Sequence, residues 1–192
     1  MSGGFENIGM PEKIQVYKDF QHLRIVRKWF GFKFILLTLF VIFWCGFLIS
    51  WYAMAFSFPF RDASILMFFI FPLLHVALGI GLAYYALTGY LNRTVIHVDF
   101  NSISIRHGPL PFWGEKQVSS KAILQLYCNE DDYWLSGRGY RYHTYAVHAI
   151  TRNWRNIKLL TGLDTSEQAL FIEQEIEKFL NIEDKPVKGE IR

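Results

Sequence analysis

Two long runs of apolar residues dominate the hydropathy pattern of the chain. No charged residue occurs in residues 34–60 or 63–91, and only Arg61 and Asp62 separate the two runs. A helix needs about 20 apolar residues to cross the hydrocarbon core of a bilayer, because each residue rises only ~1.5 Å. The pattern therefore predicts a transmembrane helical hairpin over residues 34–91.

Basic residues flank this predicted hairpin unevenly. Lys and Arg crowd the approach to the first helix, Arg93 follows the second, and the loop between them holds only Arg61, balanced by Asp62. Cytoplasmic flanks carry the excess of Lys and Arg. We therefore expect two passes with both termini in the cytoplasm. The first apolar run is too long for the apolar region of a cleavable signal peptide, so the hairpin itself is expected to direct the chain to the membrane.

The N-terminal cytoplasmic segment, residues 1–33, allows two interpretations. Apolar residues recur at helical spacing, which is typical of a basic amphipathic helix on the inner leaflet. Apolar residues also alternate on both sides of a polar turn at residues 18–22, which is typical of a β-hairpin. The density of β-branched residues favours the hairpin. In that interpretation the membrane segment interrupts a β-domain.

After Leu91 the apolar period changes to two, which indicates β-strands. Alternating runs on either side of a Phe-Asn turn predict a β-hairpin, and three further extended runs follow. We expect residues 130–141 to form a long polar loop and residues 161–164 to end the sheet. The expected strands cover residues 93–99, 102–107, 117–129, 142–152 and 157–160.

One amphipathic helix is predicted near the C-terminus. Asp164 or Thr165 caps it, Glu167 or Gln168 completes a capping box, and Asn181 is its expected end. An apolar stripe of Ala169, Ile172, Ile176, Phe179 and Leu180 faces the sheet, while Glu173, Glu177 and Lys178 are expected off this stripe. Residues 183–192 are expected to be a flexible, solvated tail.

These elements define a membrane α+β protein. It combines the two-helix hairpin with an antiparallel β-domain over residues 92–182 that ends in one amphipathic helix. Several strands followed by one C-terminal helix resemble the pleckstrin-homology fold.

The run RTVIHVD…SISIRHGPLP…WGEKQVSSKAILQLYC…KLLTGLDTSEQALFIEQEIEKFL is similar to a family of uncharacterised bacterial membrane proteins with a transmembrane hairpin and a pleckstrin-homology-like domain. The resemblance covers about residues 27–182. Its most specific segments are residues 92–95, 106–111 and 158–163. It implies a pleckstrin-homology-like cytoplasmic domain and a bacterial inner membrane, and it assigns no activity to any residue.

Composition changes this picture little. The 192 residues, 52% apolar and 18% aromatic, have room for the hairpin and one further domain of roughly 100 to 120 residues. The net charge of +3 arises in residues 1–33, whereas 13 basic and 13 acidic residues follow Leu91. Nucleic-acid binding is not expected, because it needs a basic face. Cys45 and Cys128 lie in different parts of the predicted fold, too far apart for a disulfide.

No sequence motif points to catalysis. Hydrolase, phosphate-binding and zinc-protease motifs are absent, and no Cys or His pair has zinc-ligand spacing. His97 is expected to pair with Ser104, so that His107 points to the opposite face, and His143 and His148 also point oppositely. We therefore expect a protein that is not an enzyme, with no catalytic residue, no metal site and no cofactor.

His75 is the one histidine inside the predicted membrane helices. A charged or titratable group at this depth marks function by default. In the interpretation we favour, a neutral imidazole hydrogen-bonds within the hairpin or to a partner helix, near the Phe68 carbonyl that Pro72 leaves without its helical donor. Ligation of haem or chlorophyll by His75 is the alternative.

Small residues and aromatic residues supply candidate contact sites. Helix-packing candidates are the small residues of the two predicted helices, Gly46, Ser50, Ala77, Gly79, Gly81 and Ala83, which let helices approach closely in lipid. They serve either the hairpin itself or another membrane protein. Candidate partner or interface anchors are Trp113, Tyr133 and Trp134. The alternative makes Trp113 a plug beside the prolines and Trp154 a turn residue packed on the sheet.

Three functions are compatible with these patterns. The first is a non-catalytic accessory or scaffold subunit that packs against a larger integral membrane complex through its hairpin and docks partners with its β-domain. The second is a lipid-headgroup-responsive module, with donors among Lys116, Lys121, Arg138, Arg141 and the basic segment 24–33. The third is a haem or chlorophyll carrier that uses His75.

Overall fold

The computed structural model describes residues 9–57, 64–134, 141–187 and 189–191. The chain forms two compact units. One is the β-domain, Met1–Lys28 with Arg93–Arg192, and the other is the helical hairpin, Trp29–Asn92.

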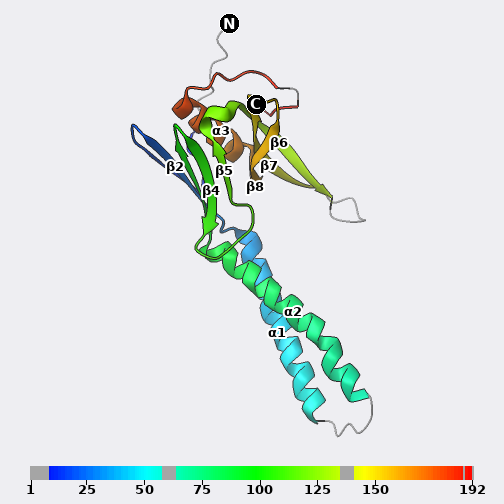
Figure 1. Cartoon of the computed structure of the whole chain (residues 1–192). Helices are drawn as coiled ribbons and strands as arrows, with labels where there is room; N and C mark the ends of the chain where they lie inside the picture. The colour runs from blue at the N-terminus through cyan, green and yellow to red at the C-terminus, as the bar shows by residue number, and fades with distance from the viewer. Residues whose placement is uncertain (1–8, 58–63, 135–140, 188, 192) are drawn as a thin grey trace. The chain divides into compact units, whose positions relative to one another are not determined.

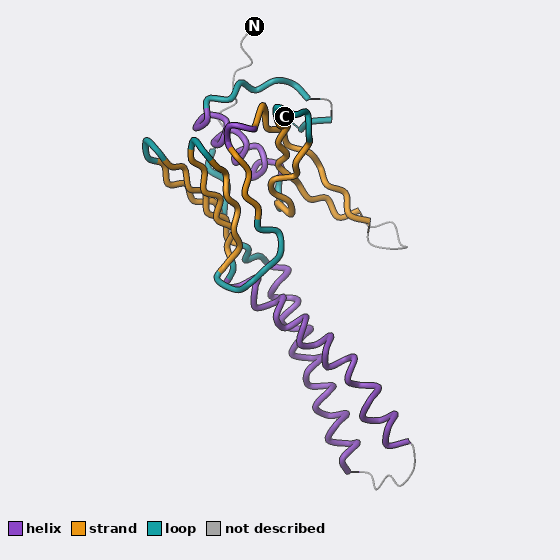
Figure 2. Tube along the Cα trace, in the orientation of Figure 1, coloured by secondary structure: helices purple, strands orange, loops and turns teal. Residues whose placement is uncertain are grey.

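The hairpin consists of α1 (Phe32–Ser57) and α2 (Ser64–Leu91), drawn in purple in Figure 2. Phe32–Ser57 has a mean hydropathy of 2.4 and Phe68–Leu91 has one of 1.8. In the most apolar stretch of each helix only 11% of the residues are buried. Both helices are long and apolar enough to cross a membrane. The two predicted helices are therefore present, and residues 58–63 between them lie outside the described residues.

Glycines allow the two helices to touch. A Cβ atom on Gly79 would lie 3.1 Å from Cδ1 of Trp44, and one on Gly89 would overlap the ring of Phe34. Trp44 therefore packs over Gly79 and Phe34 over Gly89. Small residues at such crossings bring helix backbones together, which increases van der Waals contact in lipid.

The larger sheet of the β-domain has five antiparallel strands in sequential order. They are β1 (Ile14–Lys18), β2 (His22–Lys28), β3 (Arg93–Asp99), β4 (Ser102–Gly108) and β5 (Lys116–Ser119), shown in Figure 1. Ile14 pairs with Arg27, so the N-terminal segment is a β-hairpin and not an amphipathic helix. Lys28 pairs with Arg93. The helical hairpin is thus inserted between two neighbouring strands of one sheet.

The smaller sheet has three antiparallel strands, β6 (Ile123–Trp134), β7 (Arg141–Thr151) and β8 (Asn156–Leu163). A short 3-10 helix, η1 (Ser120–Ala122), joins β5 to β6. The expected polar loop at residues 130–141 is wrong in part, because β6 continues to Trp134 and pairs there with Arg141. The expected sheet end at Thr161 is also wrong. Gly162 adopts a positive φ of 72° and β8 continues to Leu163.

The C-terminal helix α3 (Ser166–Leu180) agrees with its predicted boundaries. The Thr165 side chain accepts the N–H of Gln168, and Asn181 ends the helix in the left-handed conformation with φ 53°. The inner faces of both sheets and α3 share one hydrophobic core. Its most buried residues include Leu23, Ile25, Ile96, Val98, Ile103, Leu126, Val147, Leu163, Ile172 and Ile176.

The C-terminal region is more closely packed than its sequence suggests. Glu173 and Glu177, which were expected off the apolar stripe of α3, are only 5% and 1% exposed. The expectation of a solvated tail is wrong in part. Part of the tail also contacts the β-domain, where the N–H of Ile191 donates to the Cys128 carbonyl at 3.0 Å and the Gln125 side chain donates to the Lys185 carbonyl.

Candidate functional site

The candidate site is the outer face of the five-stranded sheet, meaning the face that points away from the shared core. Period two places Leu23 and Ile25 of β2 on the core side, so that His22, Arg24 and Lys28 lie on the outer face. The registers of β2, β3 and β4 then set the rest of this face. Its polar residues on β3 and β4 are Arg93, His97, Asp99, Ser102, Ser104 and Arg106.

Three arginines meet at one end of the outer face. Arg24, Arg93 and Arg106 come from three adjacent strands and, with His97 and Ser104, line an open groove of about 740 Å³. We call this the basic groove. All three arginines are exposed. No described residue forms an ion pair with any of them.

Like charges also lie directly opposite one another beside the groove. Lys28 of β2 pairs in register with Arg93 of β3. Such a like-charge pair destabilises a sheet by a few tenths of a kcal/mol to about 1 kcal/mol relative to a neutral pair. The arrangement therefore favours an anion, whose oxygens would accept hydrogen bonds from several guanidinium groups at once.

Two histidines and an aspartate meet next to the basic groove on the outer face, and His97 belongs to both sites. His22, His97 and Asp99 each place a nitrogen or oxygen within 4.8 Å of those of the other two. His22 lies opposite Asp99 in register. The rings of His22 and His97 stack with centroids 5.2 Å apart. We call these three residues the histidine cluster.

Sequence reasoning does not bring the histidine cluster together. His22 was placed in a polar turn, and His97 was compared only with His107 across the β3–β4 hairpin. The comparison with His107 is confirmed: His97 pairs with Ser104, and His107 lies opposite Thr94 on the other face. The pairing of β2 with β3, which sets His22 beside His97, depends on strands separated in sequence by the whole helical hairpin. The only local signal was the alternation in residues 22–28.

His107 and His148 have structural surroundings. Nδ1 of His107 lies 3.0 Å from Oγ1 of Thr94. Nδ1 of His148 lies 3.2 Å from Oδ1 of Asn156, and its ring stacks on Tyr127 with centroids 5.0 Å apart. Burial lowers the pKa of both histidines. Both are therefore neutral side chains that pack and hydrogen-bond inside the domain.

Buried carboxyl groups lie between α3 and β6. Oε1 of Glu177 accepts the N–H of Leu126 at 3.3 Å. Burial, and then the neighbouring Glu173, raise the pKa of Glu177 to about 8. Burial and the same Glu173 raise the pKa of the Cys128 thiol. Cys128 is thus a protonated core residue, which is a poor nucleophile.

The hairpin places His75 against aromatic rings. Its ring stacks on Trp44 with centroids 5.7 Å apart and packs on Phe71 at 5.1 Å. Nε1 of Trp44 donates to the His75 carbonyl at 3.1 Å. Nδ1 of His75 is buried and has no hydrogen-bond partner among the described residues. The Phe68 carbonyl receives its donor from Nε1 of Trp51, at 3.2 Å, and not from His75.

The small residues of the hairpin fall into two groups. Gly79 packs against Trp44, and Ala83 is half-buried. Gly46, Ser50, Ala77 and Gly81 are exposed, and a Cβ atom on Gly46 or Gly81 would meet no other atom within 4 Å. The first group therefore lies within the hairpin contact, and the second forms open stripes on α1 and α2.

The predicted aromatic anchors have separate surroundings. Trp113 lies between β4 and β5 and is 88% exposed. The alternative that made it a plug beside the prolines is therefore wrong. Trp154 is 81% exposed, so it does not pack on the sheet as expected. Tyr133 and Trp134 lie on β6 and not in a loop, and their side chains lie outside the described residues.

The structure therefore offers two kinds of chemistry on the outer face. Guanidinium groups can bind anions, and the imidazole and carboxylate groups of the histidine cluster can bind a cation.

Comparison of the sequence with models of known protein families and with curated proteins finds no match. The coarse class that the structure defines is a two-helix candidate membrane protein with an antiparallel β-domain that ends in a helix.

Proposed function

We propose that this protein is a non-catalytic accessory or scaffold subunit of a bacterial inner-membrane complex. In this role the two-pass hairpin packs against a larger integral membrane protein, both termini lie in the cytoplasm, and the pleckstrin-homology-like domain docks partners. The observation that supports it best is the exposed small-residue stripe on each helix.

The exposed stripes fit helix–helix packing. Ala77 and Gly81 lie four residues apart on α2, and Gly46 and Ser50 lie four apart on α1. Neither Gly46 nor Gly81 contacts the other helix, so a further helix can approach both backbones closely. Lipid chains pack against any apolar surface. Two helices gain the most van der Waals contact where small residues let their backbones approach closely.

His75 adds a polar group to the same hairpin. Its buried Nδ1 atom has no hydrogen-bond partner among the described residues, and water is scarce at membrane depth. Rotation of the half-buried His75 ring would expose Nδ1 to a Ser, Thr or Asn on a partner helix, and such bonds contribute about 1 kcal/mol in membranes.

The test uses the full chain, purified in mild detergent, with substitutions that enlarge only the open stripe. We expect the wild-type protein to migrate in a complex of defined composition, and the Ala77→Leu/Gly81→Leu double variant to migrate as the free chain. Cys45→Leu, which enlarges an exposed position of α1 outside the stripes, is the control and keeps the complex. A wild-type protein that always migrates alone would refute the proposal.

The basic groove favours a second candidate function, a module that responds to anionic lipid headgroups. Lys28 precedes α1 by four residues and Arg93 follows α2 by two. The basic residues therefore belong to the chain segments that enter and leave the membrane. Each such residue near an anionic surface contributes about 1 kcal/mol. Of the donors expected from the sequence, Arg138 lies outside the described residues, as does the Arg141 side chain, and Lys116 donates to the Lys158 carbonyl.

The second candidate is tested in nanodiscs of neutral or partly anionic lipid. We expect anionic lipid to co-purify with the wild-type chain, and Arg24→Gln/Arg106→Gln to lower its retention about tenfold. Arg155→Gln/Lys185→Gln removes the same charge from exposed positions elsewhere in the β-domain and serves as the control. Equal retention by all three proteins would remove this candidate and leave the accessory role untouched.

A further inference from the structure

We propose that the histidine cluster, His22, His97 and Asp99, binds a divalent transition-metal ion of the zinc class. This inference goes beyond the proposed function and does not depend on it. The three residues come from two adjacent strands of the outer face. Their nitrogen and oxygen atoms lie within 4.8 Å of one another.

Strand geometry holds the three side chains on one face. His22 and Asp99 are register partners, and His97 precedes Asp99 by two residues. Residues two apart in a strand point to the same side, and register partners also share a face. All three side chains therefore project from the same corner of the sheet.

Asp99 is held in place by its own turn. Its Oδ1 atom accepts the N–H groups of Asn101 at 2.6 Å and Ser102 at 2.7 Å, and its Oδ2 atom accepts the Ser102 hydroxyl at 3.2 Å. A carboxylate has about four acceptor sites, two on each oxygen. Three are used within the turn, so Oδ2 keeps one for a single bond to a metal. Such hydrogen bonds to a ligating carboxylate are typical of metal sites.

The surrounding charge also favours a cation. Oδ1 of Asp19, in the turn before β2, accepts the N–H groups of Gln21 at 2.8 Å and His22 at 2.6 Å. Asp19 interacts electrostatically with His22 and His97. A cation beside the two imidazoles thus meets the carboxylates of Asp99 and Asp19, while Arg24, the register partner of His97, adds one positive charge on the same face.

The donor set selects the class of metal. Two imidazole nitrogens and one carboxylate oxygen suit Zn²⁺, Co²⁺, Ni²⁺ and Cu²⁺, whereas Mg²⁺ and Ca²⁺ prefer a shell of oxygens. The imidazole rings are 5.2 Å apart and must converge to bind one ion at metal–nitrogen distances of about 2.0–2.1 Å. His22 is exposed at the first position of β2, so its side chain is free to rotate toward the ion. Three protein ligands leave a further position for water.

Zinc binding by the full chain tests this site. Protein purified without a polyhistidine tag is titrated with Zn²⁺ against a competing fluorescent chelator. We expect one ion per chain at pH 7.5, with at least tenfold weaker binding in His22→Gln, His97→Gln and Asp99→Asn. Asparagine at position 99 still accepts N–H bonds through its side-chain oxygen, so the turn is retained.

The control is His143→Gln, which removes an exposed histidine of β7 that pairs with Glu130. This variant is expected to bind Zn²⁺ like the wild-type protein. Zn²⁺ should also raise the unfolding temperature of the wild-type and His143→Gln proteins, but not that of His22→Gln/His97→Gln. Retention of full zinc affinity by this double variant, or no zinc binding by the wild-type protein, would overturn the proposal.

Discussion

Arg24 and Arg27 lie three residues apart on β2, yet they face opposite sides of the five-stranded sheet. Arg27 is 6% exposed, and it donates to the side chains of Gln168 and Asp164 and to the Gly162 carbonyl. Arg24 is exposed in the basic groove and forms no ion pair with any described residue. On the inner face, the arginine joins β2 to the start of α3. On the outer face, the arginine remains available to a ligand.

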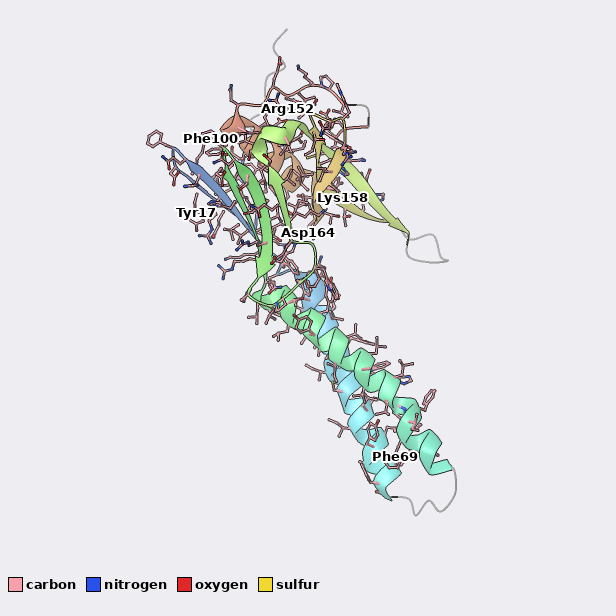
Figure 3. All side chains as sticks on the ribbon, viewed as in Figure 1. Tyr17, Phe69, Phe100, Arg152, Lys158 and Asp164 are labelled. Atoms are coloured by element: carbon pink, nitrogen blue, oxygen red, sulfur yellow. The ribbon has the colours of Figure 1, made fainter. Side chains whose placement is uncertain are left out.

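The histidines repeat this contrast. In the five-stranded sheet, His107 is hydrogen-bonded to Thr94 on the inner face, whereas His22 and His97 lie on the outer face beside Asp99. Arg27 and His107 of the inner face are thus bonded within the domain, and Arg24, His22 and His97 gather on the outer face. Figure 3 labels Asp164, which accepts a hydrogen bond from Arg27, and Tyr17, which lies on the edge strand β1.

The largest expected effect is the loss of Arg27. Arg27→Met breaks three hydrogen bonds and removes the buried guanidinium that pairs with Asp164, so we expect the free energy of unfolding to fall by about 3 kcal/mol. Arg24→Met should change it by less than about 0.5 kcal/mol. Denaturant unfolding of the two variants measures both values. Equal losses would show that the two faces do not differ as described.

The buried carboxyl of Glu177 gives the next effect, which depends on pH. Its pKa of about 8 lies above its ordinary value of 4.5, so the folded state keeps a proton that the unfolded state releases between these values. The free energy of unfolding should therefore fall by about 1 to 4 kcal/mol as the pH rises from 4.5 to 8, and then level off.

Glu177→Gln should flatten this pH dependence while its side-chain oxygen still accepts the Leu126 N–H. Glu167→Gln, at an exposed position of α3, is the control. Thermal melts at a series of pH values provide the measurement. If Glu177→Gln keeps the wild-type slope, another group carries the proton.

A smaller effect is expected in the hairpin, where Trp51 supplies the donor that Pro72 removes from the Phe68 carbonyl. Trp51→Phe should destabilise the hairpin by about 1 kcal/mol. In a Pro72→Ala background residue 72 regains its N–H, so the same substitution should cost less. A double-mutant cycle, read by unfolding in mixed micelles, measures this coupling. A coupling of zero would contradict the assigned hydrogen bond.

The smallest effect tests the like-charge pair of the outer face. Lys28→Gln should raise the free energy of unfolding by a few tenths of a kcal/mol, because Arg93 then faces a neutral partner. The gain should shrink as salt rises. Destabilisation by this substitution at low salt would indicate that Lys28 has a stabilising partner.

The helices and most strands were predictable because their signals are local. Charge-free runs long enough to cross a bilayer define α1 and α2, alternation defines β3 and β4, and the Thr165 cap with Asn181 fixes the ends of α3. The acidic residues 130–132 predicted a loop because they are polar and carry no apolar alternation. The structure continues β6 through them, since strand pairing uses backbone hydrogen bonds and needs no apolar side chains.

The candidate site was less predictable because it depends on register between distant segments. Arg93 and Arg106 are isolated basic residues in a part of the chain with no net charge, and only the β2–β3–β4 register gathers them with Arg24. The burial of Glu173 and Glu177 was not predictable for a similar reason. Contacts of α3 with β6 bury a second side of the helix, which its apolar stripe does not reveal.

The proposed function depends on a hairpin that crosses the membrane twice and keeps both termini, and with them the β-domain, in the cytoplasm. The most direct test labels single cysteines, Asp62→Cys or Arg24→Cys in a Cys45→Ser/Cys128→Ala background, with a membrane-impermeant maleimide. We expect position 62 to react in intact spheroplasts and position 24 only after the membrane is opened. Labelling of both positions from the same side would contradict the account.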